Sequence, residues 1–391
     1  MNKYGNGTTM DNKKLRFVRT AVQVLFFGFV LFITLSHGLR GMGIELPWEG
    51  GANFHAVCPF GAVESLGRLL FQGRFIPKTG GSNLWVLGGV LASTLLFGSF
   101  FCGWLCPLGS IQEWIGKIGK KLWPKLYNRV SGTKADRILG YLRYGVLIFV
   151  LVQTTRMVSL VFRSIDPYYA LFHFWTGDVA LTAFGVLAMV LVGSLFVHRP
   201  WCRWLCPFGA VLGLVQKLSP WKIRKGEDSC TACGLCSRAC PMGIDVAKKE
   251  AVTDARCNRC GECLSKCRRS GALGFSLSGE RSGIRRFARV GVLALAIFLG
   301  TVLVGGLAGG FEQGTVGTRQ GKGGIEQAIS GSMTVEELAS GLGLDAGAAR
   351  DALGLPEDLS MDIKLYDLEE IDETLTLHEI KSRVSVITDR D

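Results

Sequence analysis

The sequence lacks the motifs of self-contained substrate chemistry. Its 391 residues contain no nucleotide-binding loop, no catalytic triad and no motif of a mononuclear active site. No A-x-A cleavage site follows the first apolar segment, which is also longer than the apolar region of a secretory signal, so we expect a retained anchor. These absences argue against an enzyme that acts alone on its own substrate.

Apolar residues, in contrast, are abundant. They make up 48% of the chain, and the mean hydropathy is +0.29, which predicts an α-helical integral membrane protein. Five segments reach the length of about 18 mostly apolar residues that a membrane-spanning helix needs. They are residues 20–39, 84–105, 139–162, 179–197 and 286–307.

Lys and Arg are distributed unevenly around these five segments. They collect in the N-terminal tail, in residues 107–137 and in residues 198–286, which are therefore predicted to be cytoplasmic. We expect a multi-pass protein of the bacterial inner (cytoplasmic) membrane, with its N-terminus in the cytoplasm and its C-terminus outside.

The net charge of +12 conceals two regions of opposite sign. From Ala308 onward, 17 acidic and 7 basic residues give −10, which leaves +22 for the rest of the chain. The basic part suits anionic membrane lipid, so nucleic acid is not needed to explain it. The acidic tail suits a basic partner outside, or is a solvated domain without one.

Eight of the 13 cysteines form two Cys-x2-Cys-x2-Cys-x3-Cys runs. This is the spacing of ferredoxins with two [4Fe–4S] clusters, in which the fourth Cys of each run ligates the other cluster. The first cluster is assigned to Cys230, Cys233, Cys236 and Cys267, and the second to Cys257, Cys260, Cys263 and Cys240. Gly234 and Gly261 would give the ligand loops their backbone freedom. Two zinc ribbons are the alternative.

Two further cysteine pairs repeat 100 residues apart. The first motif runs from Cys102 to Cys106 and the second from Cys202 to Cys206, each followed by Pro. Cys at i and i+4 would share a helix face, and the Pro would end the helix. A parallel repeat about an axis along the membrane normal would bring all four thiols into a third metal or iron–sulfur site. Alternatively, they are small packing residues at helix ends.

One more pair, His55 and Cys58, lies on the predicted outer side. It could contact quinone or a ligand, or His55 could simply make an ordinary polar contact.

The order of these motifs resembles the NapH/NosR-type membrane polyferredoxin family over roughly residues 20–285. The resemblance implies electron exchange between the quinone pool and redox partners, with the eight ferredoxin cysteines as cluster ligands. It leaves the role of the other two cysteine pairs open. We find no Ser-Gly-Ala-Thr-type attachment sequence, so covalent FMN is not expected.

The predicted organisation has six parts. They are a cytoplasmic tail (1–19), a four-span membrane domain with both cysteine motifs (20–206), a small α+β ferredoxin-like domain (207–285), a fifth transmembrane helix (286–307), a Gly-rich linker (308–324) and an acidic helical domain outside (325–391). In the last part, Thr334 and Glu337 form a predicted capping box that opens a helix through Leu342. Further helices are expected at 346–353 and 377–384.

Three functions follow from these features. The favoured one is the quinol dehydrogenase component of an oxidoreductase complex, with membrane lipid, quinone and a reductase or multihaem cytochrome as partners. The second is an assembly, maturation or regulatory factor that reduces a metal or thiol, with the four motif cysteines binding the metal. The third is a membrane anchor with redox-silent clusters.

The charge distribution makes a direct prediction about topology. A reporter active only in the cytoplasm is expected to be silent when fused after Asp391. Activity of the Asp391 fusion would mean that residues 286–307 do not cross the membrane.

Overall fold

The computed structural model describes residues 7–41, 61, 63, 80–156, 161–174, 179–226, 230–267, 269, 272–277, 284–307, 334–342, 344–356, 359–360, 362–363, 365, 368, 375, 379–380 and 383–384. The chain divides into two compact units. The larger unit comprises Met1–Phe75 and Gly81–Phe311, and the smaller one Ile76–Gly80 and Glu312–Asp391.

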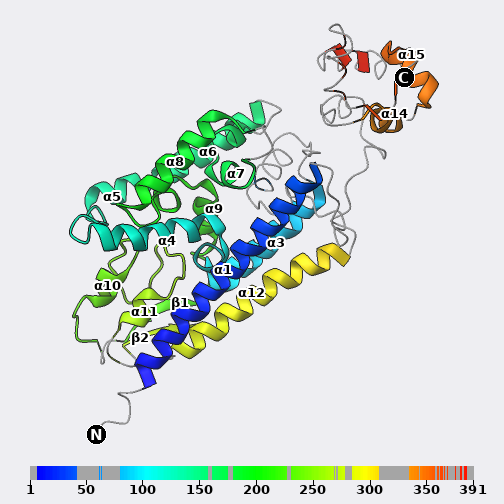
Figure 1. The fold of residues 1–391 in the computed structure, drawn as a ribbon. Coiled ribbons are helices and arrows are strands. Elements are labelled where there is room, and N and C mark those ends of the chain that lie inside the picture. The colour runs from blue at the N-terminus through cyan, green and yellow to red at the C-terminus, as the bar shows by residue number, and fades with distance from the viewer. Residues whose placement is uncertain are drawn as a thin grey trace. The chain divides into compact units, whose positions relative to one another are not determined.

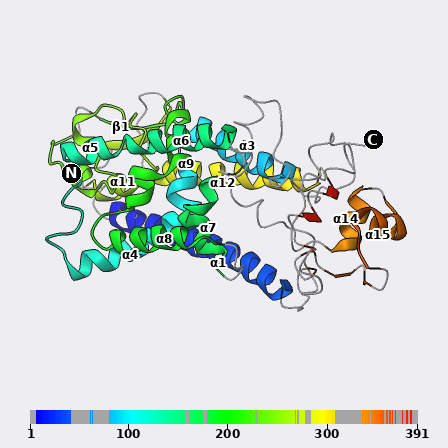
Figure 2. The ribbon, with the colours of Figure 1, turned by 90° about the horizontal axis from the view of Figure 1, so that it is seen from above.

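Among its described residues, the larger unit has three long helices, α1 (Gly7–Gly41), α3 (Gly80–Phe97) and α12 (Ile284–Leu307). Helix α3 lies beside α12 in both views (Figures 1 and 2), and α1 contacts α12. Helices α3 and α12 approach closely because α3 has Gly89 at the contact, where a Cβ would lie 2.0 Å from the Thr301 hydroxyl. On their outer faces, Leu25 is 72% exposed and Leu303 64% exposed, so apolar surface is left uncovered.

Two of the five predicted spans coincide with helices that are long and apolar enough to cross a membrane. These stretches are Lys14–Ser36 in α1 and Arg286–Gly305 in α12. The three predicted spans between them are not confirmed, because their helices are shorter. Gly98, with φ +88°, follows the end of α3, and this turn interrupts the segment predicted at 84–105. Helices α6 (Leu142–Arg156) and α8 (Leu181–Ser194) have 15 and 14 residues.

Five further helices in the described part of this unit lie around α6 and α8. They are α4 (Pro107–Leu122), α5 (Lys134–Leu139), η4 (Val161–Ser164), α7 (Pro167–Phe172) and α9 (Pro207–Val215). Apart from α5, these helices share one apolar core, with Val90 of α3, Val150 of α6 and Leu212 of α9 essentially inaccessible to solvent. Helix α4 occupies about half of the region 107–137 that follows the first cysteine motif.

The ferredoxin-like segment has the small α+β arrangement that its spacing predicted. Strands β1 (Lys222–Lys225) and β2 (Leu273–Ser276) pair antiparallel, with Lys222 opposite Ser276. Between them lie α10 (Leu235–Ala239), η6 (Val246–Lys248) and α11 (Glu262–Lys266). The buried Phe275 of β2 packs edge to face on Phe287 of α12, at 5.2 Å between ring centroids. This contact fixes the segment to the base of α12.

In the smaller unit, the two helices predicted at its start are confirmed as α14 (Val335–Leu342) and α15 (Ala346–Leu353). The capping box is also confirmed. The Thr334 amide donates to the Glu337 carboxylate at 3.1 Å, and the Glu337 amide donates to the Thr334 hydroxyl at 3.2 Å. Of the helix expected at 377–384, the four described residues, 379–380 and 383–384, are helical, and the linker at 308–324 lies outside the described residues.

Candidate functional site

Each Cys-x3-Cys motif forms one π-helical turn. The turns are η3 (Phe101–Leu105) and η5 (Trp201–Leu205). The amide of Cys106 donates to the carbonyl of Phe101 at 2.9 Å, and the amide of Cys206 donates to that of Trp201 at 2.9 Å. Two turns of equal geometry, 100 residues apart, support the predicted duplication. Isolated π turns are frequent at functional sites.

The prolines after these turns begin helices, which corrects one detail of the prediction. Pro107 is the first residue of α4 and Pro207 the first residue of α9. Proline suits this position because its fixed φ matches the helix and no amide hydrogen is needed there. Cys106 and Cys206 adopt extended backbone with ψ of 113° and 111°, so each pair spans a break between two helices.

The two motifs lie against each other. Phe101 of the first turn packs edge to face on Phe208, which follows the second motif, with centroids 5.9 Å apart. The fully buried Gln112 of α4, the helix that follows the first motif, makes two hydrogen bonds to the second motif. Its side-chain oxygen accepts from the Trp201 amide at 3.2 Å, and its nitrogen donates to the Cys202 sulfur at 3.5 Å.

A buried ion cluster surrounds the first motif, and sequence analysis did not anticipate it. The carboxylate of Glu113 binds both Arg199 and Arg19, and all three side chains are at most 6% exposed. Arg199 also donates to the Cys102 carbonyl at 2.7 Å, and Arg19 donates to the Gly103 carbonyl at 3.1 Å. Burial alone would raise the pKa of Glu113, but the two guanidinium groups hold it well below its usual range.

The four motif thiols influence one another electrostatically. Burial raises the pKa of the Cys206 thiol well above its ordinary value, and the neighbouring thiols of Cys202, Cys102 and Cys106 raise it further. Within the described residues, no group of three or more His, Cys, Asp or Glu side chains is spaced to hold a single metal ion. That statement covers all twelve described cysteines, including the eight of the ferredoxin-like segment.

The two ligand loops of the ferredoxin-like segment have matching backbone conformations. Ala232 and Arg259, each just before the second Cys of its run, both have φ of +51°. Gly234 and Gly261, each just after that Cys, have φ of +68° and +78°, which confirms the need for glycine predicted there. Each loop then enters a five-residue helix, α10 or α11.

Two cavities in this segment separate the eight cysteines into two sets. A cavity of about 20 Å³ is lined by Cys240, Cys257, Cys260 and Cys263. Another of about 270 Å³ is lined by Cys230, Cys233, Cys236 and Cys267. Each set combines three thiols of one run with the fourth thiol of the other. The donor set fits iron–sulfur chemistry, since clusters of this type are held by four Cys thiolates.

The two sets differ in their exposure to solvent. Cys257, Cys260 and Cys263 are buried, whereas Cys233 of the other set is exposed. Burial raises the pKa of Cys260 to about 12 and that of Cys240 to about 11. These thiols therefore stay protonated at neutral pH unless a bound cation replaces the protons.

The first motif touches the buried loop directly. The Trp104 indole donates to the Arg259 carbonyl at 3.1 Å. At Gly103, an added Cβ would lie 2.1 Å from the Asn258 carbonyl oxygen, so only glycine fits there. Asn258 and Arg259 are the two residues between Cys257 and Cys260. The first motif therefore abuts the loop that carries these two thiols.

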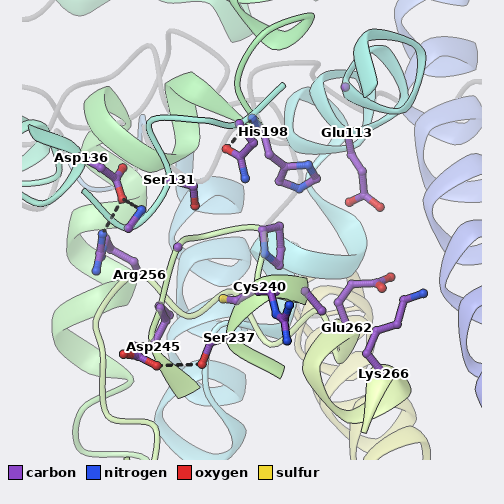
Figure 3. A pocket seen from close by; sticks show the side chains of 18 of the residues that line it. Glu113, Ser131, Asp136, His198, Ser237, Cys240, Asp245, Arg256, Glu262 and Lys266 are labelled. Atoms are coloured by element: carbon purple, nitrogen blue, oxygen red, sulfur yellow. Dashed lines mark hydrogen bonds and ion pairs between the residues drawn. The ribbon is translucent and has the colours of Figure 1, made fainter. Parts of the chain in front are cut away.

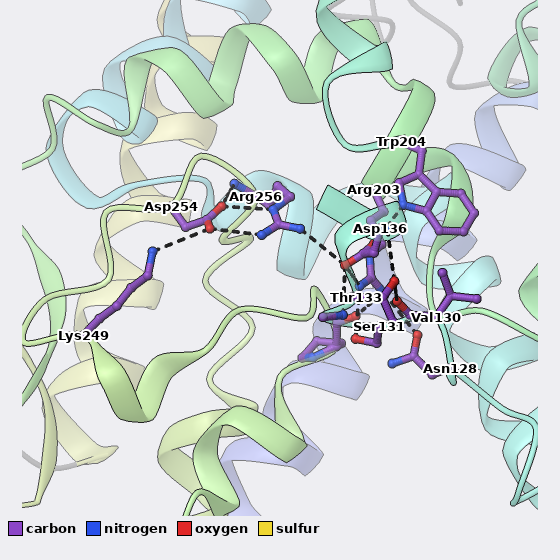
Figure 4. A network of polar contacts seen from close by, with 12 residues as sticks. Asn128, Val130, Ser131, Thr133, Asp136, Arg203, Trp204, Lys249, Asp254 and Arg256 are labelled. Atoms are coloured by element: carbon purple, nitrogen blue, oxygen red, sulfur yellow. Dashed lines mark hydrogen bonds and ion pairs between the residues drawn. The ribbon is translucent and has the colours of Figure 1, made fainter. Parts of the chain in front are cut away.

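The second motif reaches the same region through charged side chains (Figure 4). Arg203 forms a fully buried ion pair with Asp136, and it lies 3.4 Å from the carbonyl of Pro241, the residue after Cys240. Asp136 also accepts from the Trp204 indole at 2.9 Å and lies 3.5 Å from Arg256. Asp136 therefore links the second motif to the ferredoxin-like segment.

The other predicted site, His55 with Cys58, lies outside the described residues. Its proposed contact with quinone or a ligand stays a prediction.

Two models of protein families match the chain. A 4Fe-4S binding domain matches residues 79–125 and 179–226, which contain the first and the second motif. A 4Fe-4S dicluster domain matches residues 222–268, which contain all eight ferredoxin cysteines.

Similar proteins include YccM of Escherichia coli (strain K12), an electron transport protein by its name, at 32% identity over 62% of this chain and 69% of YccM. The uncharacterized protein MJ0750 of Methanocaldococcus jannaschii is 31% identical over 68% of this chain and 98% of its own length. The ferredoxin-type protein NapH of Haemophilus influenzae is 27% identical over 50% of this chain and 68% of NapH. No solved structure matches the chain.

The contact at Gly103 predicts the effect of a single methyl group. In Gly103→Ala, the new Cβ would force the first motif away from Asn258, and we expect a loss of about 1–3 kcal/mol of stability from overpacking. Thermal unfolding in detergent, followed by tryptophan fluorescence, measures this loss.

The matched control is Gly145→Ala, on α6, where nothing lies within 4 Å of the new Cβ. It should leave the midpoint of unfolding unchanged or raise it slightly, because Ala favours a helix over Gly. Equal midpoints for the two variants would contradict the close contact at Gly103.

Proposed function

Because the chain belongs to the NapH/NosR-type polyferredoxin family, we propose that it is a membrane electron-transfer subunit that relays electrons between the quinone pool and a redox partner. Two [4Fe–4S] clusters carry the electrons in the ferredoxin-like segment. One observation carries the proposal: each of the two cavities there is lined by four cysteines in the crossed pattern of a two-cluster ferredoxin.

The first cluster is held by Cys230, Cys233, Cys236 and Cys267, and the second by Cys257, Cys260, Cys263 and Cys240. Bound iron supplies a reversible one-electron change at each site. The protein holds the second cluster away from water, because three of its thiols are buried. The first cluster, with Cys233 exposed, is the one that a redox partner can approach.

The two cysteine motifs form a third iron–sulfur site, between the membrane helices and the second cluster. The match of a 4Fe-4S binding model to both repeats supports this assignment over small packing residues. The buried Arg199 beside Cys102 also supports it, since a positive charge offsets the negative charge of thiolate ligands. The relay then runs between this third site, the second cluster and the first cluster, in that spatial order.

Membrane attachment by five spans stays part of the proposal. The long apolar stretches in α1 and α12 support its first and last spans. Uncovered apolar side chains on the shorter helices support the others, with Ile148 of α6 62% exposed and Leu181 of α8 85% exposed. Exchange with quinone rests on the family resemblance.

The crossed ligation is tested by a reciprocal pair of substitutions. Cys240→Ala is expected to remove the second cluster, because Cys240 lines the cavity of that cluster and not the cavity of the first. Cys267→Ala is expected to remove the first cluster for the same reason. Anaerobic iron and sulfide analysis with electron paramagnetic resonance measures each loss.

The unsubstituted protein should contain at least eight iron atoms per chain, which is four for each cluster, and more if the third site is filled. If Cys240→Ala removed the cluster of its own run instead, the ligation would be uncrossed. About four iron atoms per chain in the unsubstituted protein would contradict the assignment of two clusters.

The third site is tested by the double substitution Cys106→Ala and Cys206→Ala. Reduction of the ferredoxin clusters by added quinol should be abolished, because the link between the membrane and the second cluster is lost. Dithionite should still reduce both clusters in this variant, which controls for their assembly. Reduction by quinol at the unsubstituted rate would contradict a relay through the motifs.

A further inference from the structure

A large polar cavity lies beside the loop that carries Cys240 (Figure 3). Its volume is about 1050 Å³, which is at the upper end of the roughly 300–1,000 Å³ typical of small-molecule sites. Its walls come from α1, α4, the 127–137 connection with α5, and the ferredoxin-like segment. The iron–sulfur sites proposed above do not account for this cavity.

The lining of this cavity is strongly cationic. Ten Lys and Arg side chains face five Asp and Glu side chains, which gives a net charge of +5. Several cations are already paired, such as Arg256 with Asp254 and Lys248 with Asp245. Among the described residues, no carboxylate lies within ion-pair distance of the lining residues Lys120, Arg137 or Lys266.

Neutral polar groups complete the wall. His198 lines the cavity, and its Nδ1 lies 3.2 Å from the Tyr127 hydroxyl. Burial lowers the pKa of His198 to about 3, so the imidazole is neutral and one ring nitrogen can accept a hydrogen bond while the other donates. Asn128 and Ser131 add further hydrogen-bonding groups.

We propose that this cavity binds a phosphate-bearing organic anion of about nucleotide size. Arg and Lys together bind phosphate well, because Arg offers paired donors and Lys a mobile point charge. The sequence has no Gly-rich phosphate loop, so side chains rather than backbone amides supply the donors. The phosphate belongs either to a soluble nucleotide-like molecule or to a lipid headgroup, since α1 and α4 both line the cavity.

The cavity adjoins a ligand of the proposed second cluster, so a bound anion would affect electron transfer. This part of the inference rests on the proposed function. Cys240 and Pro241 line the cavity wall. A bound anion there would disfavour the more negative, reduced form of the cluster. Binding is therefore expected to lower the reduction potential of the second cluster and to leave that of the exposed first cluster nearly unchanged.

The test uses the full-length protein with its clusters, in nanodiscs of phosphatidylcholine, and fluorescent adenosine diphosphate as the probe. The double variant Lys120→Gln with Lys266→Gln should bind the probe about tenfold more weakly. The matched control is Lys121→Gln with Lys217→Gln, two exposed lysines that do not line the cavity. This control should bind like the unsubstituted protein.

A second arm replaces the probe with nanodiscs that contain phosphatidylglycerol, and the reduction potential of each cluster is measured in both arms. A lower potential of the second cluster with the probe supports a soluble ligand, and the same change with the anionic lipid alone supports a headgroup. The site is refuted if neither arm changes the reduction potential of the second cluster, or if the cavity variant shows the same change as the unsubstituted protein. Binding is measured separately from iron content, so failure of cluster assembly would be recognised as such.

Discussion

The buried ion cluster of Glu113, Arg199 and Arg19 is the interaction on which the larger unit depends. It joins α1, α4 and Arg199, which lies three residues before Cys202 of the second motif, so it links three segments far apart in the sequence. Removing one partner would leave an uncompensated buried charge, which typically costs about 3–5 kcal/mol. The same guanidinium groups hold the carbonyls of Cys102 and Gly103, so the ions also fix the backbone of the first motif.

Both motifs contact the ferredoxin-like segment at the loops that carry the cysteines of the proposed second cluster. They do so by different means although they are repeats. The first motif uses shape, with Gly103 and Trp104 against the backbone between Cys257 and Cys260. The second uses charge, through Arg203 and Asp136. The two π turns are similar, and the one position that differs between their cysteines, Gly103 in the first and Arg203 in the second, fits each turn to a different part of the same region.

The sequence predicted the parts of this arrangement that depend on spacing. Cysteine spacing predicted the ferredoxin-like segment, the crossed sets of cysteines that line its two cavities and the glycines that its loops need. It did not predict the buried ion cluster, because Arg19, Glu113 and Arg199 stand in segments outside the predicted spans, where charged residues are usually solvated. The break at Gly98 was also missed, since hydropathy does not distinguish a continuous helix from two short ones joined by a left-handed turn.

The two proposed clusters differ in what can change their reduction potentials. Around the second cluster, burial favours the less charged, oxidised form, while cations such as Arg203 and Arg256 favour the reduced form. These opposing effects are built into the fold, and only a change of charge in the adjoining cationic cavity would alter their balance. Around the first cluster, Cys233 is exposed, so contact with water influences the reduction potential of this cluster unless a partner covers that loop. A partner that covers the Cys233 loop would therefore change the reduction potential of the first cluster, and an anion bound in the proposed cavity would change that of the second.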